Sequence, residues 1–96
     1  MQEAKLEVDD LEWDDTNEAH CARHGVTPTL VQAIMNDAPK FYANREGRTG
    51  THMVIGSDEL DRLWTIIILP AGAQGRWRAI TGWPSTNTET GLYQGA

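Results

Sequence analysis

The chain has 96 residues, 40% of them hydrophobic, and a formal net charge of −6. This length fits a single domain over residues 1–96 with a modest core, so a large enclosed active site is not expected. One cysteine, Cys21, excludes an intrachain disulfide, which small secreted domains usually need.

The sequence favours a cytoplasmic protein that is neither inserted in a membrane nor exported. Its longest apolar run, Ile66–Leu69, is far shorter than a membrane span. The acidic N-terminus does not resemble a signal peptide. Eight of the 14 acidic residues lie in the first 20 positions, whereas the rest of the chain carries seven basic and six acidic residues. The net charge therefore does not exclude a local arginine cluster that binds nucleic acid.

The first half of the chain is expected to be mainly helical. Residues 1–4 are expected to be disordered, and the loose alternation over Leu6–Trp13 suggests a short strand. A helix is expected over about residues 16–24, with an aspartate or threonine as N-cap and Gly25 as its end. A second helix is expected to begin after Thr27, because Pro28 suits a first helical position. Its apolar stripe is Leu30, Val31, Ile34 and Met35.

After Pro39 the apolar period changes to two, which is typical of strands. Four strands are expected, over Phe41–Asn44, Thr51–Ile55, Arg62–Leu69 and Arg76–Trp83. Simple alternation on the last strand predicts one face with Arg76, Arg78, Ile80 and Gly82, and an opposite face with Trp77, Ala79, Thr81 and Trp83. Ser85 or Thr86 can cap a short final helix with Glu89 in its first turn. The sequence thus predicts an α+β fold, with two N-terminal helices on a four- to five-stranded, mainly antiparallel sheet and a short C-terminal helix.

The order of these elements and several short motifs resemble the BrnT family over nearly the whole chain. The motifs are Trp13-Asp14, His24-Gly25-Val26, Val54-Ile55-Gly56, Asp61-Arg62-Leu63, Trp77-Arg78-Ala79-Ile80-Thr81, Glu89 and Tyr93. BrnT proteins are bacterial toxins of type II toxin–antitoxin pairs, with a RelE-like fold and ribonuclease activity that a BrnA antitoxin neutralises. The resemblance implies a hetero-oligomer with a BrnA-like antitoxin and an RNA substrate.

The sequence departs from that family at two basic positions. BrnT chains usually continue the last strand as Ser-Ala-Arg and a further basic residue, and carry Glu-Arg before the terminal Tyr. Here those places read Thr81-Gly82-Trp83-Pro84 and Glu89-Thr90. A catalytically inactive relative that binds a protein partner or RNA is therefore the alternative. A DNA-binding subunit is a further alternative, although the chain has no basic recognition helix.

Metal-independent RNA cleavage needs cations at the phosphate and groups that move protons. Arg62 and Arg78, on strands expected to be neighbours, are predicted to stabilise the phosphate as a pair. Glu89 and Tyr93 are the candidates for proton transfer, with His52 as a further one. The candidate RNA-binding residues are Arg48, Arg76, Thr81, Ser85 and Trp83. Solvated arginines, helix capping by Glu89 and core packing of Tyr93 are the structural alternatives.

No cofactor or metal site is expected. His20 and His24 share a helix face as in zinc proteases, but Cys21 replaces the glutamate that such chemistry needs and no third ligand is evident. The acidic segment over residues 1–20 is either a solvated face or a surface that steers a basic antitoxin segment.

Overall fold

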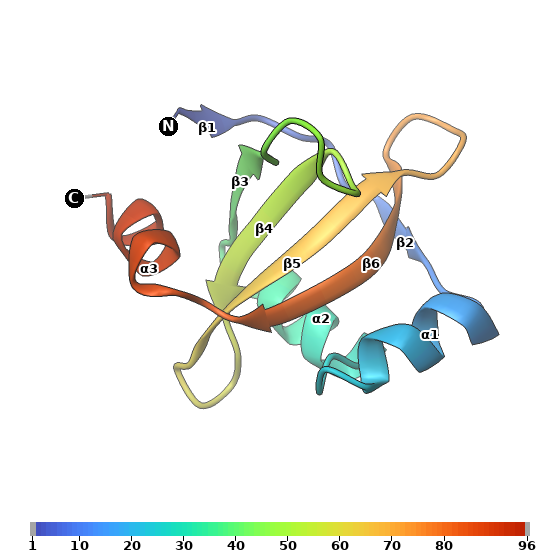
Figure 1. Ribbon diagram of the computed structural model, residues 1–96, viewed down its shortest axis with the longest axis horizontal. Coiled ribbons are helices and arrows are strands. Elements are labelled where there is room, and N and C mark those ends of the chain that lie inside the picture. Colours follow the sequence, from blue (N-terminus) through green and yellow to red (C-terminus); the bar gives the residue numbers. More distant parts are fainter. Residues whose placement is uncertain (1, 96) are drawn as a thin grey trace.

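The computed structural model describes residues 2–95, which fold into three helices and one six-stranded mixed sheet (Figure 1). The strand order across the sheet is β1-β3-β4-β5-β6-β2. In chain order the elements are β1 (Glu3–Ala4), β2 (Asp10–Glu12), α1 (Asp15–Ala22), α2 (Pro28–Asn36), β3 (Lys40–Ala43), β4 (His52–Ser57), β5 (Leu63–Pro70), β6 (Arg76–Pro84) and α3 (Asn87–Gln94). The α+β class is confirmed, and the sheet has more strands than predicted.

The additional strand arises because the N-terminal segment pairs with both edges of the sheet. Glu3–Ala4 forms β1, antiparallel to β3, so the prediction of disorder is wrong for these two residues; Met1 lies outside the described residues. The predicted strand over Leu6–Trp13 shortens to β2, which runs parallel to β6. Between the two strands the chain crosses the sheet, and Leu6 packs against the same core cluster as the first two helices. Paired backbone at both edges explains why this acidic segment is ordered.

The three helices begin at capping residues expected from the sequence. Asp14 caps α1 in a capping box with Asn17, Thr27 caps α2, and Thr86 caps α3 in a second capping box with Glu89. Gly25 takes a left-handed conformation, with φ of 77°, just after α1. Over residues 2–95, no helix has the length and apolar character required to cross a bilayer.

The sheet separates two apolar clusters. Helices α1 and α2 cover one face, where Val31 and Ile34 pack against Val54, Ile66 and Ile68. On the opposite face Tyr42, Met53, Ile55 and Ile67 pack with Leu92 and Tyr93 of α3. The third helix has no fully buried residue, so it covers its face only in part. The uncovered part of that face is where a ligand can reach the sheet.

A β-bulge changes which side chains of β6 share a face. Ile67 pairs with Thr81 and Ile68 pairs with Ala79, which leaves Ile80 as an extra residue without a partner. The alternation of the strand is therefore interrupted after Ile80, so that Ile80 and Thr81 lie on the same face. Trp77 and Ala79 pack against the α1–α2 cluster, whereas Ile80 and Trp83 pack against the opposite cluster. The simple alternation predicted for this strand holds through Ile80 and is wrong from Thr81 on, because one inserted residue moves every later side chain to the other face.

Candidate functional site

The predicted pair of Arg62 and Arg78 does not form. Arg62 directly precedes Leu63 at one end of β5, whereas Arg78 lies opposite Leu69 near the other end. Seven residue steps, from Arg62 to Leu69, separate these positions by about 23 Å. The two guanidinium groups therefore cannot act on one phosphate, and this part of the sequence-based hypothesis is wrong.

Arg62 instead belongs to the turn between β4 and β5. Its Nε donates to Asp58 Oδ2 at 3.0 Å, and the same carboxylate accepts the backbone N–H groups of Leu60 and Arg62 and the indole N–H of Trp64. These hydrogen bonds, that from the Arg62 amide above all, lower the pKa of Asp58 to about 2 against the effect of desolvation. Asp61 takes a φ of 59° in this turn, a conformation more common for glycine. The arginine therefore helps to fix a turn.

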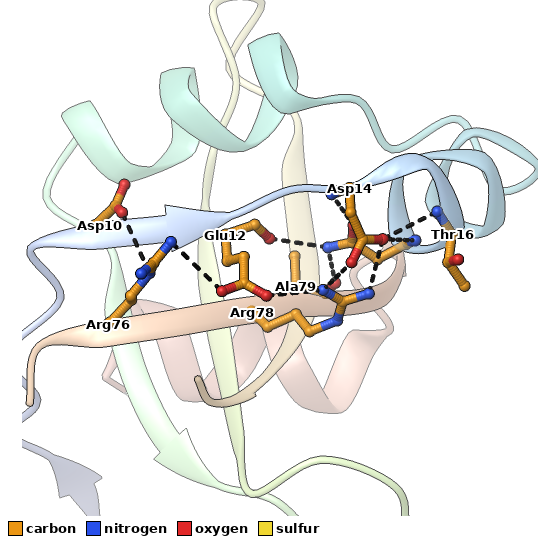
Figure 2. Close-up of polar contacts among 8 residues, drawn as sticks. Asp10, Glu12, Asp14, Thr16, Arg76, Arg78 and Ala79 are labelled. Atoms are coloured by element: carbon orange, nitrogen blue, oxygen red, sulfur yellow. Dashed lines mark hydrogen bonds and ion pairs between the residues drawn. The ribbon is translucent and has the colours of Figure 1, made fainter. Parts of the chain in front are cut away.

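Arg78 joins β6 to the N-terminal segment (Figure 2). Its Nη1 donates to Asp14 Oδ2 at 2.6 Å and to Glu12 Oε1 at 3.1 Å, and its Nη2 donates to Asp14 Oδ1 at 2.9 Å. The hydrogen bond from Arg78 is the main cause that lowers the pKa of Asp14 to about 2, and the same bond raises the pKa of Arg78. Two hydrogen bonds from the two Nη atoms of one arginine to the two oxygens of one carboxylate are typical of a strong ion pair. A phosphate would have to compete with two carboxylates for this side chain.

Arg76 extends the same row of ion pairs (Figure 2). Its Nε lies 3.6 Å from Asp10 Oδ2 and its Nη2 lies 3.4 Å from Glu12 Oε2. These distances are longer than those of Arg78 and the side chain is more exposed, so the pairing is weaker. Arg76 and Arg78, both predicted from the sequence to contact RNA, thus face the acidic strand β2.

A concave pocket of about 620 Å³ lies on the face of the sheet that α3 covers in part. Two exposed arginines of the β3–β4 loop, Arg45 and Arg48, line one side. Its other residues are Asn44, Thr49, Met53, Ile67, Thr81, Trp83, Thr86, Thr88, Glu89 and Leu92. Four of the predicted site residues meet here: Arg48, Thr81, Trp83 and Glu89.

The arginines of this pocket are available to a ligand. Neither Arg45 nor Arg48 forms an ion pair with any side chain of residues 2–95. The loop that carries them is ordered by Asn44, whose Nδ2 donates to the carbonyl oxygens of Thr49 and Gly50. An anchored loop with two exposed guanidinium groups is suited to binding an anion.

Glu89 presents one engaged and one free carboxylate oxygen. Its Oε1 accepts hydrogen bonds from Thr65 Oγ1 at 2.8 Å, Trp83 Nε1 at 2.9 Å and the Thr86 backbone N–H at 2.9 Å. Oε2 accepts none from the part of the chain that the structure describes. Burial raises the pKa of Glu89, but these hydrogen bonds outweigh it and hold the pKa below the usual glutamate value. Glu89 is therefore ionised at neutral pH.

A buried network fixes this carboxylate. Thr65 is fully buried in β5, and its hydroxyl lies 2.9 Å from the hydroxyl of Ser85 as well as bonding Glu89. Ser85 thus contributes to the network and is not among the pocket-lining residues. Because Trp83 holds Glu89 through its indole N–H, the ring orientation is also set. The capping role expected for Glu89 is confirmed, and it coexists with a position in the pocket wall.

Tyr93 lies outside the pocket lining. Its ring packs against the apolar cluster beneath α3, with Lys40 Nζ 5.4 Å from the ring centroid. Lys40 also donates to the Tyr93 carbonyl oxygen at 2.6 Å, and the Tyr42 hydroxyl donates to the Leu92 carbonyl oxygen at 2.8 Å. Both bonds attach the C-terminal end of α3 to β3. Tyr93 therefore has a packing role and is not part of the pocket lined by Arg45 and Arg48.

The histidines do not contribute to the pocket. His52 Nδ1 lies 2.8 Å from Thr51 Oγ1, its ring meets that of Trp77 edge-on at 5.3 Å, and burial lowers its pKa. The rings of His20 and His24 lie 5.4 Å apart beside the buried Cys21, whose pKa burial raises. Among residues 2–95, no three histidine, cysteine or acidic side chains come together in a way that could hold a metal ion.

Two residues of the site were not anticipated from the sequence. Arg45 lies three positions before Arg48 in the same polar, glycine-containing loop. This spacing could have indicated that the two arginines act together. Thr65 is the single polar residue within the apolar β5, which marks a buried group in need of a partner. Its partner, Glu89, is 24 residues away and could not be identified without the fold.

Comparison with known proteins gives no further assignment: no protein-family model matches this chain, and no curated protein matches it significantly.

The pKa of Glu89 should depend on its buried donors. Thr65→Val and Trp83→Phe each remove one hydrogen bond to Oε1, so each is expected to raise the pKa of Glu89. Carboxyl-carbon NMR titration of the two variants and the parent measures this directly. Thr88→Val, which changes a pocket residue that does not bond Glu89, is the control. A pKa that stays unchanged in both variants would contradict the proposed network.

The stability of the fold should fall in acid because of Asp14 and Asp58. Their folded pKa values of about 2 lie below the ordinary 3.8, so their contribution is present above pH 4 and is lost as the pH falls toward 2. Urea unfolding of Asp14→Asn at pH 2–5 should show a smaller decrease than the parent. Ile66→Val, which costs about 1 kcal/mol without removing a charge, should keep the full decrease. Equal decreases in the parent and Asp14→Asn would refute this account.

Proposed function

We propose that this chain is a BrnT-like toxin with a RelE-like fold, a metal-independent endoribonuclease that acts on mRNA in the cytoplasm. The observation that supports it most is the pocket, where two arginines without ion pairs and an ionised glutamate with one free oxygen line the same hollow. The sequence resemblance supports the same class. The residues proposed for the chemistry are Arg45, Arg48 and Glu89, in place of Arg62 and Arg78.

In this proposal Glu89 Oε2 removes the proton from the ribose 2′-hydroxyl. The resulting alkoxide oxygen attacks the adjacent phosphorus, the P–O bond to the 5′-oxygen breaks, and a 2′,3′-cyclic phosphate forms. Arg45 and Arg48 stabilise the charge that develops on the non-bridging oxygens. The pocket is open, so water can supply the proton to the leaving 5′-oxygen. A glutamate with a lowered pKa is a weak base, which predicts a modest rate.

The remaining predicted residues take supporting roles. Thr81 and Thr88 offer hydroxyl groups to the RNA from the pocket lining, and the ring of Trp83 offers a surface for a base. Ser85 acts through Thr65 on the carboxylate. Arg76 is half exposed and weakly paired, so it is assigned a peripheral RNA contact. Tyr93 is assigned to the packing of α3 and not to catalysis.

A second candidate function is RNA binding without cleavage. It is favoured by the three hydrogen bonds that already engage Glu89 Oε1, because a helix-capping carboxylate of low basicity need not be a base. In that case Arg45 and Arg48 would still bind phosphates. In both cases we propose that a BrnA-like antitoxin is the protein partner. Growth arrest on expression of this chain, relieved by the product of the neighbouring gene, would support the proposed antitoxin partner.

The cleavage proposal predicts that the purified chain cuts single-stranded RNA in excess chelator and leaves 2′,3′-cyclic phosphate ends. Arg45→Ala and Arg48→Ala should each reduce the rate about 10²- to 10³-fold, by loss of charge stabilisation. Glu89→Gln should reduce it about 10²- to 10⁴-fold, by loss of the base. Arg62→Ala is the matched control, since that arginine is exposed and belongs to a turn outside the pocket; its rate should stay close to that of the parent.

Intact RNA at high concentrations of the parent chain would eliminate cleavage. RNA binding by the parent that Arg45→Ala and Arg48→Ala weaken would then leave the second candidate. If Arg62→Ala lost as much activity as Arg48→Ala while remaining folded, the assignment of the site to this pocket would be wrong.

A further inference from the structure

A second, smaller groove lies between the N-terminal segment and helix α2. Its volume is about 240 Å³, and it is lined by Val8, Asp9, Asp10, Leu11, Trp13, Pro28, Gln32 and Met35. Its lining combines the apolar side chains of Leu11, Trp13 and Met35 with polar groups, among which the two aspartates contribute the charge. It is bounded by β2 and α2, whereas the pocket with Arg45 and Arg48 lies on the sheet face next to α3. The two hollows therefore use different parts of the surface.

Helix α2 presents an uncharged surface beside this groove. No residue of Pro28–Asn36 is charged, although Thr29, Gln32 and Asn36 are exposed. Helices that face only water usually carry charged residues on the outer side. By contrast, the central part of a protein–protein interface is poor in charged residues and rich in aromatic residues and methionine. Trp13 and Met35, both half-buried, fit that composition.

The carboxylates next to the groove determine the charge of a matching partner. Asp10 lies 3.6 Å from Arg76, and Asp9 makes no ion pair with any basic side chain in the described part of the chain. The groove follows the segment that holds eight of the chain's 14 acidic residues. A polyanion would be repelled there, whereas lysine or arginine side chains would be attracted.

We propose that this groove binds a basic amphipathic helix of a protein partner. One apolar side chain of that helix enters the hollow between Leu11, Trp13 and Met35, and its lysines or arginines lie along Asp9 and Asp10. The hollow has room for one or two large side chains, as in interfaces where a few anchors carry most of the binding energy. This proposal does not require the chain to cleave RNA. Because the groove is separate from the arginine pocket, partner and RNA should bind at the same time.

The test uses a synthetic amphipathic helix of leucine and lysine, and the same peptide with glutamate in place of lysine. Titrated into the ¹⁵N-labelled full chain, the lysine peptide should shift the signals of Leu11, Trp13 and the Gln32 side-chain amide, and the glutamate peptide should not. Met35→Lys should weaken binding at least about tenfold, since it places a charge in the anchor site. Asn36→Lys, which adds the same charge at an exposed neighbouring position, should weaken it much less.

A second pair of variants separates the groove from the general negative charge of the segment. Asp9→Asn should weaken the lysine peptide more than Glu18→Gln, because Glu18 lies on α1 outside the groove lining. Equal effects of the two variants, equal binding of both peptides, or no binding at all would overturn the proposal. Concentration-dependent shifts of the same signals without peptide would also overturn it, because they would assign the groove to a second copy of the chain.

Discussion

Arg78 holds the last strand to the N-terminal segment, and much of the fold depends on that attachment. Its guanidinium group bridges Glu12 on β2 and Asp14, the N-cap of α1. Directly beneath, the buried Asn17 donates to the carbonyl oxygens of Glu12 and Ala79, and accepts the Asp14 amide. Strand β2, the start of α1 and the middle of β6 therefore meet at one set of hydrogen bonds. This set positions α1 over the core face of the sheet.

The same bridge decides which arginines remain without a carboxylate partner. Carboxylates engage Arg62, Arg76 and Arg78, whereas Arg45 and Arg48 of the β3–β4 loop line the pocket and form no ion pair with residues 2–95. The acidic N-terminal segment thus neutralises the arginines of β6 and leaves those of the β3–β4 loop available. A strongly acidic chain can in this way keep a positively charged pocket, because the ion pairs of Arg76 and Arg78 lie along strand β2, whereas the pocket is lined by the β3–β4 loop and α3. Glu89 then adds a fixed negative group to that pocket.

Local signals predicted most of the secondary structure. The N-caps Thr27 and Thr86, Pro28 and the left-handed Gly25 placed the helices within a few residues, since caps act through near neighbours. Strand β1 was not predicted and the predicted strand over Leu6–Trp13 was longer than β2, because both edge strands depend on pairing with β3 and β6, which are far away in the chain. The same holds for the bulge at Ile80, which exists only relative to β5.

The candidate site was predicted in its residue types and only partly in its geometry. Arg48, Thr81, Trp83 and Glu89 do meet, and Trp83 and Thr81 do so because the bulge turns them to that face. The predicted pairing of Arg62 with Arg78 is wrong because the two strands are antiparallel. Residues near the start of one antiparallel strand lie opposite residues near the end of its neighbour. Predicting the register of β5 and β6 would have required the length of the turn between them and the position of the bulge.

We propose that the phosphate-binding arginines are the two of the β3–β4 loop, Arg45 and Arg48. The most direct measurement follows the Nε–Hε NMR signals of all arginines while a short, non-cleavable 2′-deoxy analogue of single-stranded RNA is added. The structure predicts that the signals of Arg45 and Arg48 shift together and saturate, while those of Arg62 and Arg78 stay in place. Shifts confined to Arg62 and Arg78 would contradict the claim.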